Sequence, residues 1–184
     1  MENSVKSINM IDAVKLFFKN YFNFTGRASR SEYWWFVLAY FIVAVVFAII
    51  EAVVVGSMVY NDPYAAINIL RFWYLMPSNI LAFALLIGFL SLAARRLQDR
   101  GYTGWWQLAT LAPTILIYII FLALLASGGE NVGLAVLMII LGLIVIGTSI
   151  TMIVFLCLPP KEDENKWGRN PLLPETSLTD QIPD

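Results

Sequence analysis

The chain has no histidine and a single cysteine among its 184 residues, and its formal net charge is −1. Without histidine, it lacks the commonest metal ligand and the side chain that most often acts as acid or base near neutral pH. One cysteine cannot form an internal disulfide, and we interpret Cys157, which ends an apolar run, as a small hydrophobic residue. A net charge near zero provides no overall field for nucleic acid. We expect no metal, no cofactor and no nucleic-acid partner.

Charged residues of either sign are also scarce. They make up 14% of the chain, whereas 59% of its residues are hydrophobic and the mean hydropathy is +0.72. An average soluble domain is about a quarter charged and roughly 45–50% apolar. A soluble domain of this length could not bury so much apolar surface, because a large share of its area still faces water. Lipid is therefore the expected solvent for much of the chain.

Long hydrophobic runs are abundant, and four of them have the length needed to span a membrane. About 20 apolar residues cross the hydrocarbon, and backbone groups there must be paired within a helix. The predicted spans are residues 34–58, 77–94, 105–126 and 134–158. The predicted fold is all-α, an integral membrane four-helix bundle over residues 34–158. A segment of residues 1–33 precedes it, and a partly disordered tail of residues 159–184 follows it.

The positions of lysine and arginine predict the orientation of these spans. Eleven of the twelve basic residues fall before the first span, between the second and third spans, or in the tail, and only Arg71 falls elsewhere. Short cytoplasmic loops carry an excess of lysine and arginine. Both termini and the middle loop are therefore predicted to be cytoplasmic.

An amphipathic helix is predicted over residues 5–22. Apolar residues such as Val14, Phe17 and Phe18 recur there at steps of three and four, while Lys15 and Lys19 fall on the other side. A helix of this kind can lie at the boundary of the inner leaflet. Its apolar face could also pack against the bundle, with or without contact to lipid.

Three polar motifs interrupt the apolar background: FTGRASRSEYW at residues 24–34, ARRLQDRGYTGWW at residues 94–106, and ENKWGRNP at residues 164–171. The first two adjoin predicted spans, and the third lies in the tail. In the second motif, Gly101 and Gly104 are expected to permit a tight turn between spans.

These motifs resemble those of the bacterial inner-membrane family catalogued as domain of unknown function 805, over residues 14–174. Members of that family carry F-x-G-R-x-S-R-x-E-[YF]-W, then A-R-R-L-H-D-x-G-x-S-G-W-W, then N-x-[YFW]-G-x-x-P. Gln98 stands where the family commonly has histidine, and Thr103 where it commonly has serine. The resemblance implies a multi-pass protein of the bacterial inner membrane and supplies no reaction. Any acid, base or metal role of that histidine would be missing here.

The predicted topology brings the charged residues of the first two motifs to one membrane depth. In one interpretation they form an ion-pair layer in which Glu32 and Asp99 bind two or more arginines and fix the packing of helix ends. In the other they bind an anionic lipid headgroup or another anionic ligand. The candidate residues are Arg27, Arg30, Glu32, Arg95, Arg96, Asp99 and Arg100.

Glu51 is the only ionisable residue well inside a predicted span. An intramembrane carboxylate can mark a transport path. Glu51 is close to the outer end of its span, however, so a carboxylate that faces the interface or pairs with Arg71 is the alternative.

The leading functional hypothesis is a non-enzymatic module of the bacterial inner membrane. Its expected partners are anionic lipid headgroups at the cytoplasmic face, together with an unknown membrane protein or further copies of the chain. A small oligomeric transporter or channel is the alternative. No catalytic residues are predicted, because the spans contain no nucleophile–base pair, no H-E-x-x-H motif and no paired carboxylates.

Overall fold

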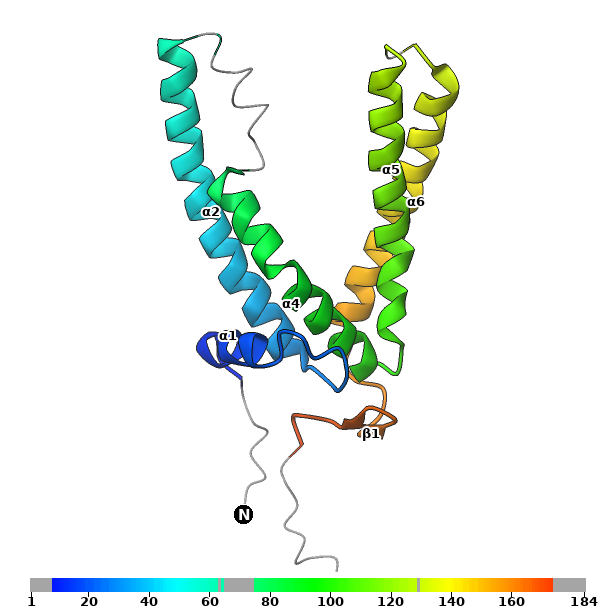
Figure 1. Cartoon of the computed structure of the whole chain (residues 1–184). Helices are drawn as coiled ribbons and strands as arrows, with labels where there is room; N and C mark the ends of the chain where they lie inside the picture. The colour runs from blue at the N-terminus through cyan, green and yellow to red at the C-terminus, as the bar shows by residue number, and fades with distance from the viewer. Residues whose placement is uncertain (1–7, 63, 65–74, 129, 174–184) are drawn as a thin grey trace, which may run out of the picture. The chain divides into compact units, whose positions relative to one another are not determined.

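The computed structural model describes residues 8–62, 64, 75–128 and 130–173, which are mostly helical (Figure 1). The helices are α1 (Met10–Lys19), α2 (Arg30–Asn61), α4 (Pro77–Asp99), the short 3-10 helix η2 (Gly104–Gln107), α5 (Leu108–Ala126) and α6 (Val132–Cys157). Strands β1 (Glu164–Asn165) and β2 (Gly168–Arg169) form a small antiparallel hairpin, in which Glu164 pairs with Arg169. Within these residues, α2, α4, η2 with α5, and α6 are four helical segments long and apolar enough to cross a membrane. The all-α membrane fold class is therefore confirmed.

Three helices differ clearly in length from their predicted segments. The helix α2 runs from Arg30 to Asn61, so it extends beyond the predicted span 34–58 at both ends. The second predicted span stops at Ala94, but α4 continues to Asp99, so Arg95 and Arg96 are helical. Arginine is a good helix former, and nothing in the sequence breaks the helix before Gly101. In contrast, α1 covers only part of the segment 5–22, of which residues 5–7 lie outside the described chain. It begins after Asn9, whose side chain accepts a hydrogen bond from the Asp12 amide at 2.9 Å.

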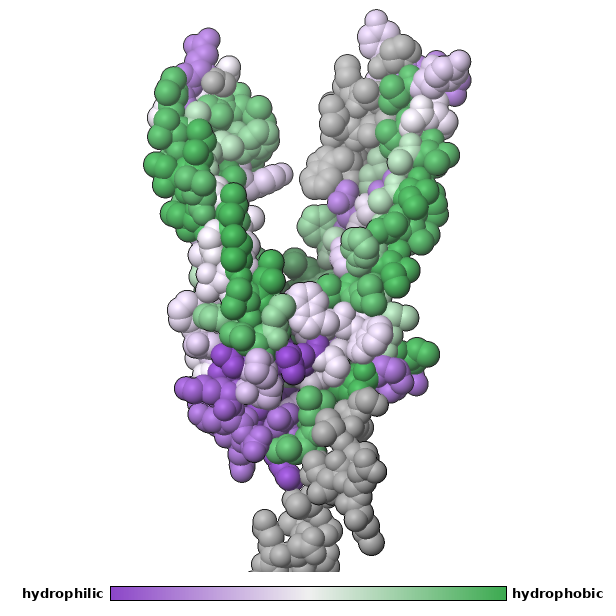
Figure 2. All heavy atoms as spheres, turned by 180° about the vertical axis from the view of Figure 1, so that it is seen from behind, coloured by the Kyte–Doolittle hydropathy of each residue, from purple (hydrophilic) through white to green (hydrophobic). Residues whose placement is uncertain are grey.

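The spanning helices expose their apolar side chains. Most large apolar residues of α2, α5 and α6 are exposed, and Figure 2 shows hydrophobic side chains covering the α5–α6 hairpin. A water-soluble protein rarely exposes continuous apolar surface of this extent. Helices that are hydrophobic on all sides are instead solvated by lipid.

The described chain forms two compact units. We call residues 8–23 and 31–92 the aromatic unit, and residues 24–30 and 93–173 the arginine unit. In the aromatic unit, α1 lies across α2 and α4 (Figure 1), and the ring of Phe17 stacks on Phe36 with centroids 3.6 Å apart. Phe89 of α4 contacts both rings by its edge. The Ser91 hydroxyl donates to the Asn20 carbonyl at 3.0 Å, which fixes the end of α1.

In the arginine unit, α5 and α6 pack as an antiparallel hairpin (Figure 1). Asn131 begins α6 by accepting a hydrogen bond from the Leu134 amide at 3.1 Å. After α6 the chain turns at Pro159 and Pro160 and forms the β1–β2 hairpin against the end of α4. Hydrophilic residues cover this part of the unit in Figure 2. The expected disorder at the end of the tail, and the proposed partner Arg71 of Glu51, fall on residues 174–184 and 65–74, outside the described chain.

Candidate functional site

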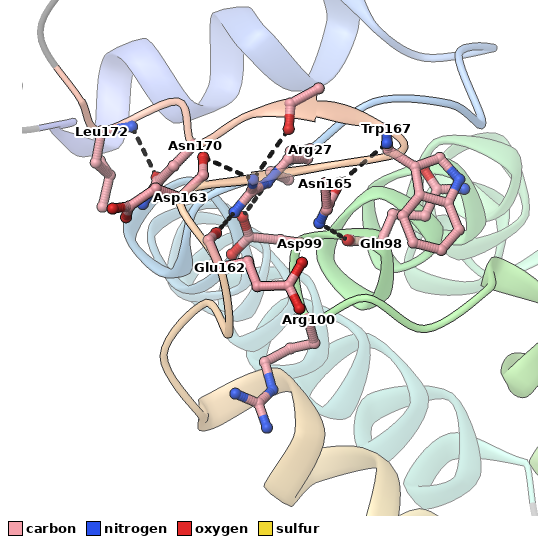
Figure 3. A network of polar contacts seen from close by, with 12 residues as sticks. Arg27, Gln98, Asp99, Arg100, Glu162, Asp163, Asn165, Trp167, Asn170 and Leu172 are labelled. Atoms are coloured by element: carbon pink, nitrogen blue, oxygen red, sulfur yellow. Dashed lines mark hydrogen bonds and ion pairs between the residues drawn. The ribbon is translucent and has the colours of Figure 1, made fainter.

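A buried cluster of charges lies where the three motifs meet in the arginine unit (Figure 3). Asp99, the last residue of α4, is 1% exposed and binds two guanidinium groups. One carboxylate oxygen accepts from Arg27 Nε at 2.8 Å, and the other forms an ion pair with Arg96 Nη1, one turn earlier on α4. We call Arg27, Arg96 and Asp99 the arginine–aspartate cluster. The cluster contains two cations and one carboxylate, so it carries a net positive charge. The guanidinium donors that do not bind Asp99 therefore need other hydrogen-bond acceptors.

Backbone carbonyls of the tail supply the acceptors for Arg27. Its Nη1 donates to the carbonyls of Asp163 and Gly168, at 3.1 and 3.0 Å, and its Nη2 donates to the carbonyl of Glu162 at 2.9 Å (Figure 3). A guanidinium carries five N–H donors in a planar fork, and a lysine amine could not reach acceptors in so many directions. Arg27 therefore ties the first motif to both sides of the β1–β2 hairpin.

The end of α6 supplies the acceptors for Arg96. Its Nε donates to the Leu156 carbonyl at 3.0 Å, and its Nη2 donates to the Leu158 carbonyl. The last carbonyls of a helix lack partners within the helix, and they carry the negative end of its dipole. Here Pro159 and Pro160 have no N–H, so the chain itself cannot provide the donor that the Leu156 carbonyl would receive from residue 160. Arg96 supplies that donor from α4.

The second motif also ends α4. The Tyr102 amide donates to the Leu97 carbonyl and the Gly101 amide to the Gln98 carbonyl, each at 3.0 Å, and Gly101 has a φ of 84°. This is the Schellman arrangement, in which glycine occupies the left-handed position after a helix. A Cβ on Gly104 would approach the Ala94 Cβ to 2.7 Å, so η2 packs closely against α4. The glycines and the alanine of this motif are thus explained by the geometry of the turn.

Gln98 replaces the family's common histidine, and it has a structural contact. Its side-chain Nε2 donates to the Phe24 carbonyl at 2.9 Å, and its backbone carbonyl accepts from Asn165 Nδ2 at 2.9 Å. The residue therefore joins the first and third motifs to α4. Among the described residues, no group of three or more histidine, cysteine, aspartate or glutamate side chains could hold a metal ion.

The other candidate residues of the predicted layer lie in different surroundings. Arg95 is buried, and its carbonyl accepts from the Ala28 amide at 3.2 Å. Arg100 follows α4, and its Nη1 donates to the Pro159 carbonyl. Arg30 is exposed at the first residue of α2. Glu32, in the first turn of α2, is buried and belongs to the aromatic unit.

Within the described chain, Glu51 makes two hydrogen bonds with the start of α4. Its carboxylate oxygens accept from the backbone amide and the hydroxyl of Ser78, each at 2.7 Å. The first amides of a helix lack partners within the helix, and its N-terminus favours negative charge. Glu51 of α2 therefore acts as a cap for α4, a contact that sequence reasoning missed because Ser78 lies in a different span.

A second surface is formed by α1, whose apolar residues divide into two sets. Ala13 and Phe17 are fully buried in the aromatic unit. In contrast, Ile11 and Phe18 of the helix are exposed at 65% and 57%, and Phe22, in the turn that follows α1, at 78%. The exposed set adjoins Lys15 and Lys19, which are also exposed. This arrangement leaves an apolar strip bordered by positive charge, which we call the α1 strip.

Comparison with known proteins gives consistent matches. A model of the family described as "Protein of unknown function (DUF805)" matches residues 21–169. The chain is 33% identical over 115 residues to "Inner membrane protein YhaI" of Escherichia coli K12, an alignment that covers 61% of this chain and 84% of that protein. It is 30% identical over 120 residues to "Inner membrane protein YhaH" of the same strain, covering 61% and 85%. No solved structure matches.

Proposed function

Because this chain belongs to the DUF805 family of proteins of unknown function, we propose that it is a multi-pass protein of the bacterial inner membrane that binds anionic lipid headgroups at its cytoplasmic face without catalysing a reaction. The relatives named above carry the description of inner-membrane proteins. Both termini of the chain are cytoplasmic in this proposal.

The contacts of the arginine unit support this orientation. The end of α4, the end of α6 and the loop that contains Arg27 are joined through the arginine–aspartate cluster. These three segments must therefore lie on one side of the membrane. Together with the tail that follows α6, they carry eight of the twelve basic residues, which favours the cytoplasmic side.

The α1 strip is the observation that carries the proposal of lipid binding. Ile11, Phe18 and Phe22 remain exposed although Phe17, on the neighbouring face, is fully buried. Exposed apolar side chains beside lysines are typical of a helix that lies in the headgroup region. Each lysine near an anionic leaflet adds about 1 kcal/mol to its attraction. The two lysines of α1 therefore give the surface a preference for anionic lipid.

The contacts of the motif arginines support a role other than catalysis. Arg27 and Arg96 are directed at Asp99 and at backbone carbonyls, which are groups that hold segments together. Since these donors are engaged by the chain itself, both side chains serve to hold helix ends and loops together.

Mass spectrometry of lipids retained by the purified protein tests the proposal. The full chain is extracted from bacterial membranes in a mild detergent, and retained phosphatidylglycerol and phosphatidylethanolamine are counted against their proportion in the membrane. We expect enrichment of the anionic lipid, reduced roughly tenfold or more in the Lys15→Gln/Lys19→Gln variant. The Lys15→Arg/Lys19→Arg variant keeps both charges and should retain the enrichment. Retention of the two lipids in their membrane proportion by the wild-type chain would refute the proposal.

A further inference from the structure

A pocket of about 310 Å³ lies within the arginine unit, between the turn after α4 and the β1–β2 hairpin. Arg100 and Tyr102 line it from the turn, and Lys161, Glu162, Lys166 and Trp167 line it from the tail. The two walls are more than 50 residues apart in the sequence, so only the fold brings them together. None of the three motifs taken alone contains this site.

Hydrogen bonds fix both walls of the pocket. Asn165 donates from Nδ2 to the Gln98 carbonyl and accepts from the Trp167 amide at its Oδ1, each at 2.9 Å (Figure 3). Arg27 holds the carbonyl of Glu162 at 2.9 Å. On the opposite wall the Schellman turn at Gly101 fixes the backbone that follows Arg100. A site whose walls are already ordered loses little entropy when a ligand binds.

The pocket has a surplus of positive charge. Three basic side chains, Arg100, Lys161 and Lys166, line it together with one carboxylate, Glu162. In Figure 3 the Arg100 side chain points away from Arg27. Its Nη1 donates to the Pro159 carbonyl, which holds the guanidinium beside the start of the tail. The Lys166 amine lies 4.2 Å from the centre of the Trp167 ring, which orders that amine.

We propose that this pocket binds the phosphate group of an anionic lipid headgroup. The proposal rests on the proposed function, since it names a second lipid contact at the same face. Phosphate oxygens match guanidinium and ammonium donors in charge and geometry. A volume of about 310 Å³ is at the small end of ligand pockets, which suits a headgroup rather than a whole lipid.

The neighbouring aromatic residues favour a lipid as the source of that phosphate. The Tyr102 ring stacks on Phe155, in the last turns of α6, with centroids 4.6 Å apart. Trp105 and Trp106 follow in the chain and are 76% and 49% exposed. Amphipathic rings gather at headgroup depth. The pocket therefore opens where a spanning helix ends and where the phosphates of the inner leaflet would lie.

Calorimetric titration of the full chain in an uncharged detergent tests this site. The probes are dihexanoyl phosphatidylglycerol, dihexanoyl phosphatidylcholine and inorganic phosphate. We expect phosphatidylglycerol to bind, phosphatidylcholine to bind at least tenfold more weakly, and Lys161→Gln/Lys166→Gln to weaken phosphatidylglycerol binding about tenfold or more. These lysines are exposed, so the variant should unfold at the same temperature as the wild type. The Lys161→Arg/Lys166→Arg variant should restore binding.

Two controls separate this proposal from the preceding one. Lys15→Gln/Lys19→Gln removes only the contribution of the α1 strip, so the phosphatidylglycerol binding that depends on Lys161 and Lys166 should persist in that variant. If that variant loses the binding while the pocket variant keeps it, the pocket proposal is overturned and the α1 proposal stands. Unchanged lipid retention in the α1 variant, together with lost binding in the pocket variant, would overturn the α1 proposal and support the pocket proposal. Inorganic phosphate could bind as tightly as phosphatidylglycerol and lose its binding in the pocket variant. That result would overturn the assignment of a lipid as the ligand and favour a soluble phosphate. Equal binding of all probes by both variants would overturn the site itself.

Discussion

The aromatic unit and the arginine unit are each stabilised internally by a different kind of interaction, although α4 contributes residues to both. In the aromatic unit the rings of Phe17, Phe36 and Phe89 pack the flanks of three helices. In the arginine unit, Arg27 and Arg96 join helix ends and loops through Asp99 and through backbone carbonyls. The difference follows from what each surface needs. The flank of a helix has no unpaired backbone groups and needs only complementary shape, whereas a helix end needs hydrogen-bond donors or acceptors.

The largest expected effect comes from removing the shared carboxylate of the arginine unit. Asp99→Ala leaves two buried guanidinium groups without their anion, so the free energy of unfolding should fall by about 3–5 kcal/mol. Unfolding of the detergent-solubilised protein by sodium dodecyl sulfate, followed by circular dichroism, measures the change. Asp163→Ala is the control, because Arg27 contacts the Asp163 carbonyl rather than its exposed side chain. The control should change stability by less than about 0.5 kcal/mol. Equal losses in the two variants would contradict a structural role for the Asp99 carboxylate.

The corresponding change in the aromatic unit is Phe17→Ala. It removes a fully buried ring that stacks on Phe36 and should cost about 3 kcal/mol in the same assay. The adjacent residue Phe18 is 57% exposed, so Phe18→Ala should cost less than about 1 kcal/mol. The pair compares one ring inside the unit with one ring on the α1 strip. A larger loss for Phe18 than for Phe17 would mean that the assignment of the two faces of α1 is wrong.

A smaller effect is expected where α1 crosses α4. A Cβ at Gly88 would lie 2.3 Å from the Phe17 ring, so Gly88→Ala should destabilise the protein by about 1–2 kcal/mol. For Gly56 of α2, no heavy atom of the described residues outside its own helix backbone lies within 4 Å of the same position, and Gly56→Ala should be neutral or slightly stabilising. Unfolding of the double variant Phe17→Ala/Gly88→Ala provides the sharper measurement. With the Phe17 ring absent, part of the cost of the added methyl group should disappear, while the contact with the Tyr21 ring, 2.7 Å from the same position, remains. Strictly additive losses would show that Gly88 does not act through Phe17.

The four spans could be predicted because membrane crossing is a local property of the sequence. A run of about 20 apolar residues is sufficient, and no distant contact is required. The end of α4 was less predictable. The charges of Arg95 and Arg96 suggested a loop, yet the helix continues to the Schellman turn at Gly101. A charged residue can extend a helix beyond its apolar segment when other parts of the fold bind that charge.

The candidate site was only partly predictable. The motifs suggested Asp99 as a partner of two or more arginines, and it contacts Arg27 and Arg96. Most of the arginine acceptors, however, are backbone carbonyls, which are present at every residue and carry no sequence signal. Pro159 and Pro160 were an available clue, since two missing N–H groups after α6 require donors from elsewhere. The pocket beside Trp167 depends on how the tail folds back, which the sequence did not reveal.

The smallest effect on stability is expected at Glu51, which caps a helix end in the aromatic unit. This helix end can be compared with the helix ends of the arginine unit. The Glu51 carboxylate accepts two hydrogen bonds from Ser78, so Glu51→Ala should lower stability by about 1 kcal/mol, and Glu51→Gln by less, because the amide oxygen can still accept. Glu130→Ala, at an exposed position before α6, should have no effect. Proton flux into liposomes distinguishes this cap from an ion path. A carboxylate that carries protons would lose flux on conversion to glutamine, whereas a cap would change stability alone. Loss of flux in Glu51→Gln at unchanged stability would therefore favour a transporter, and would mean that only the arginine unit uses charge to complete its helix ends.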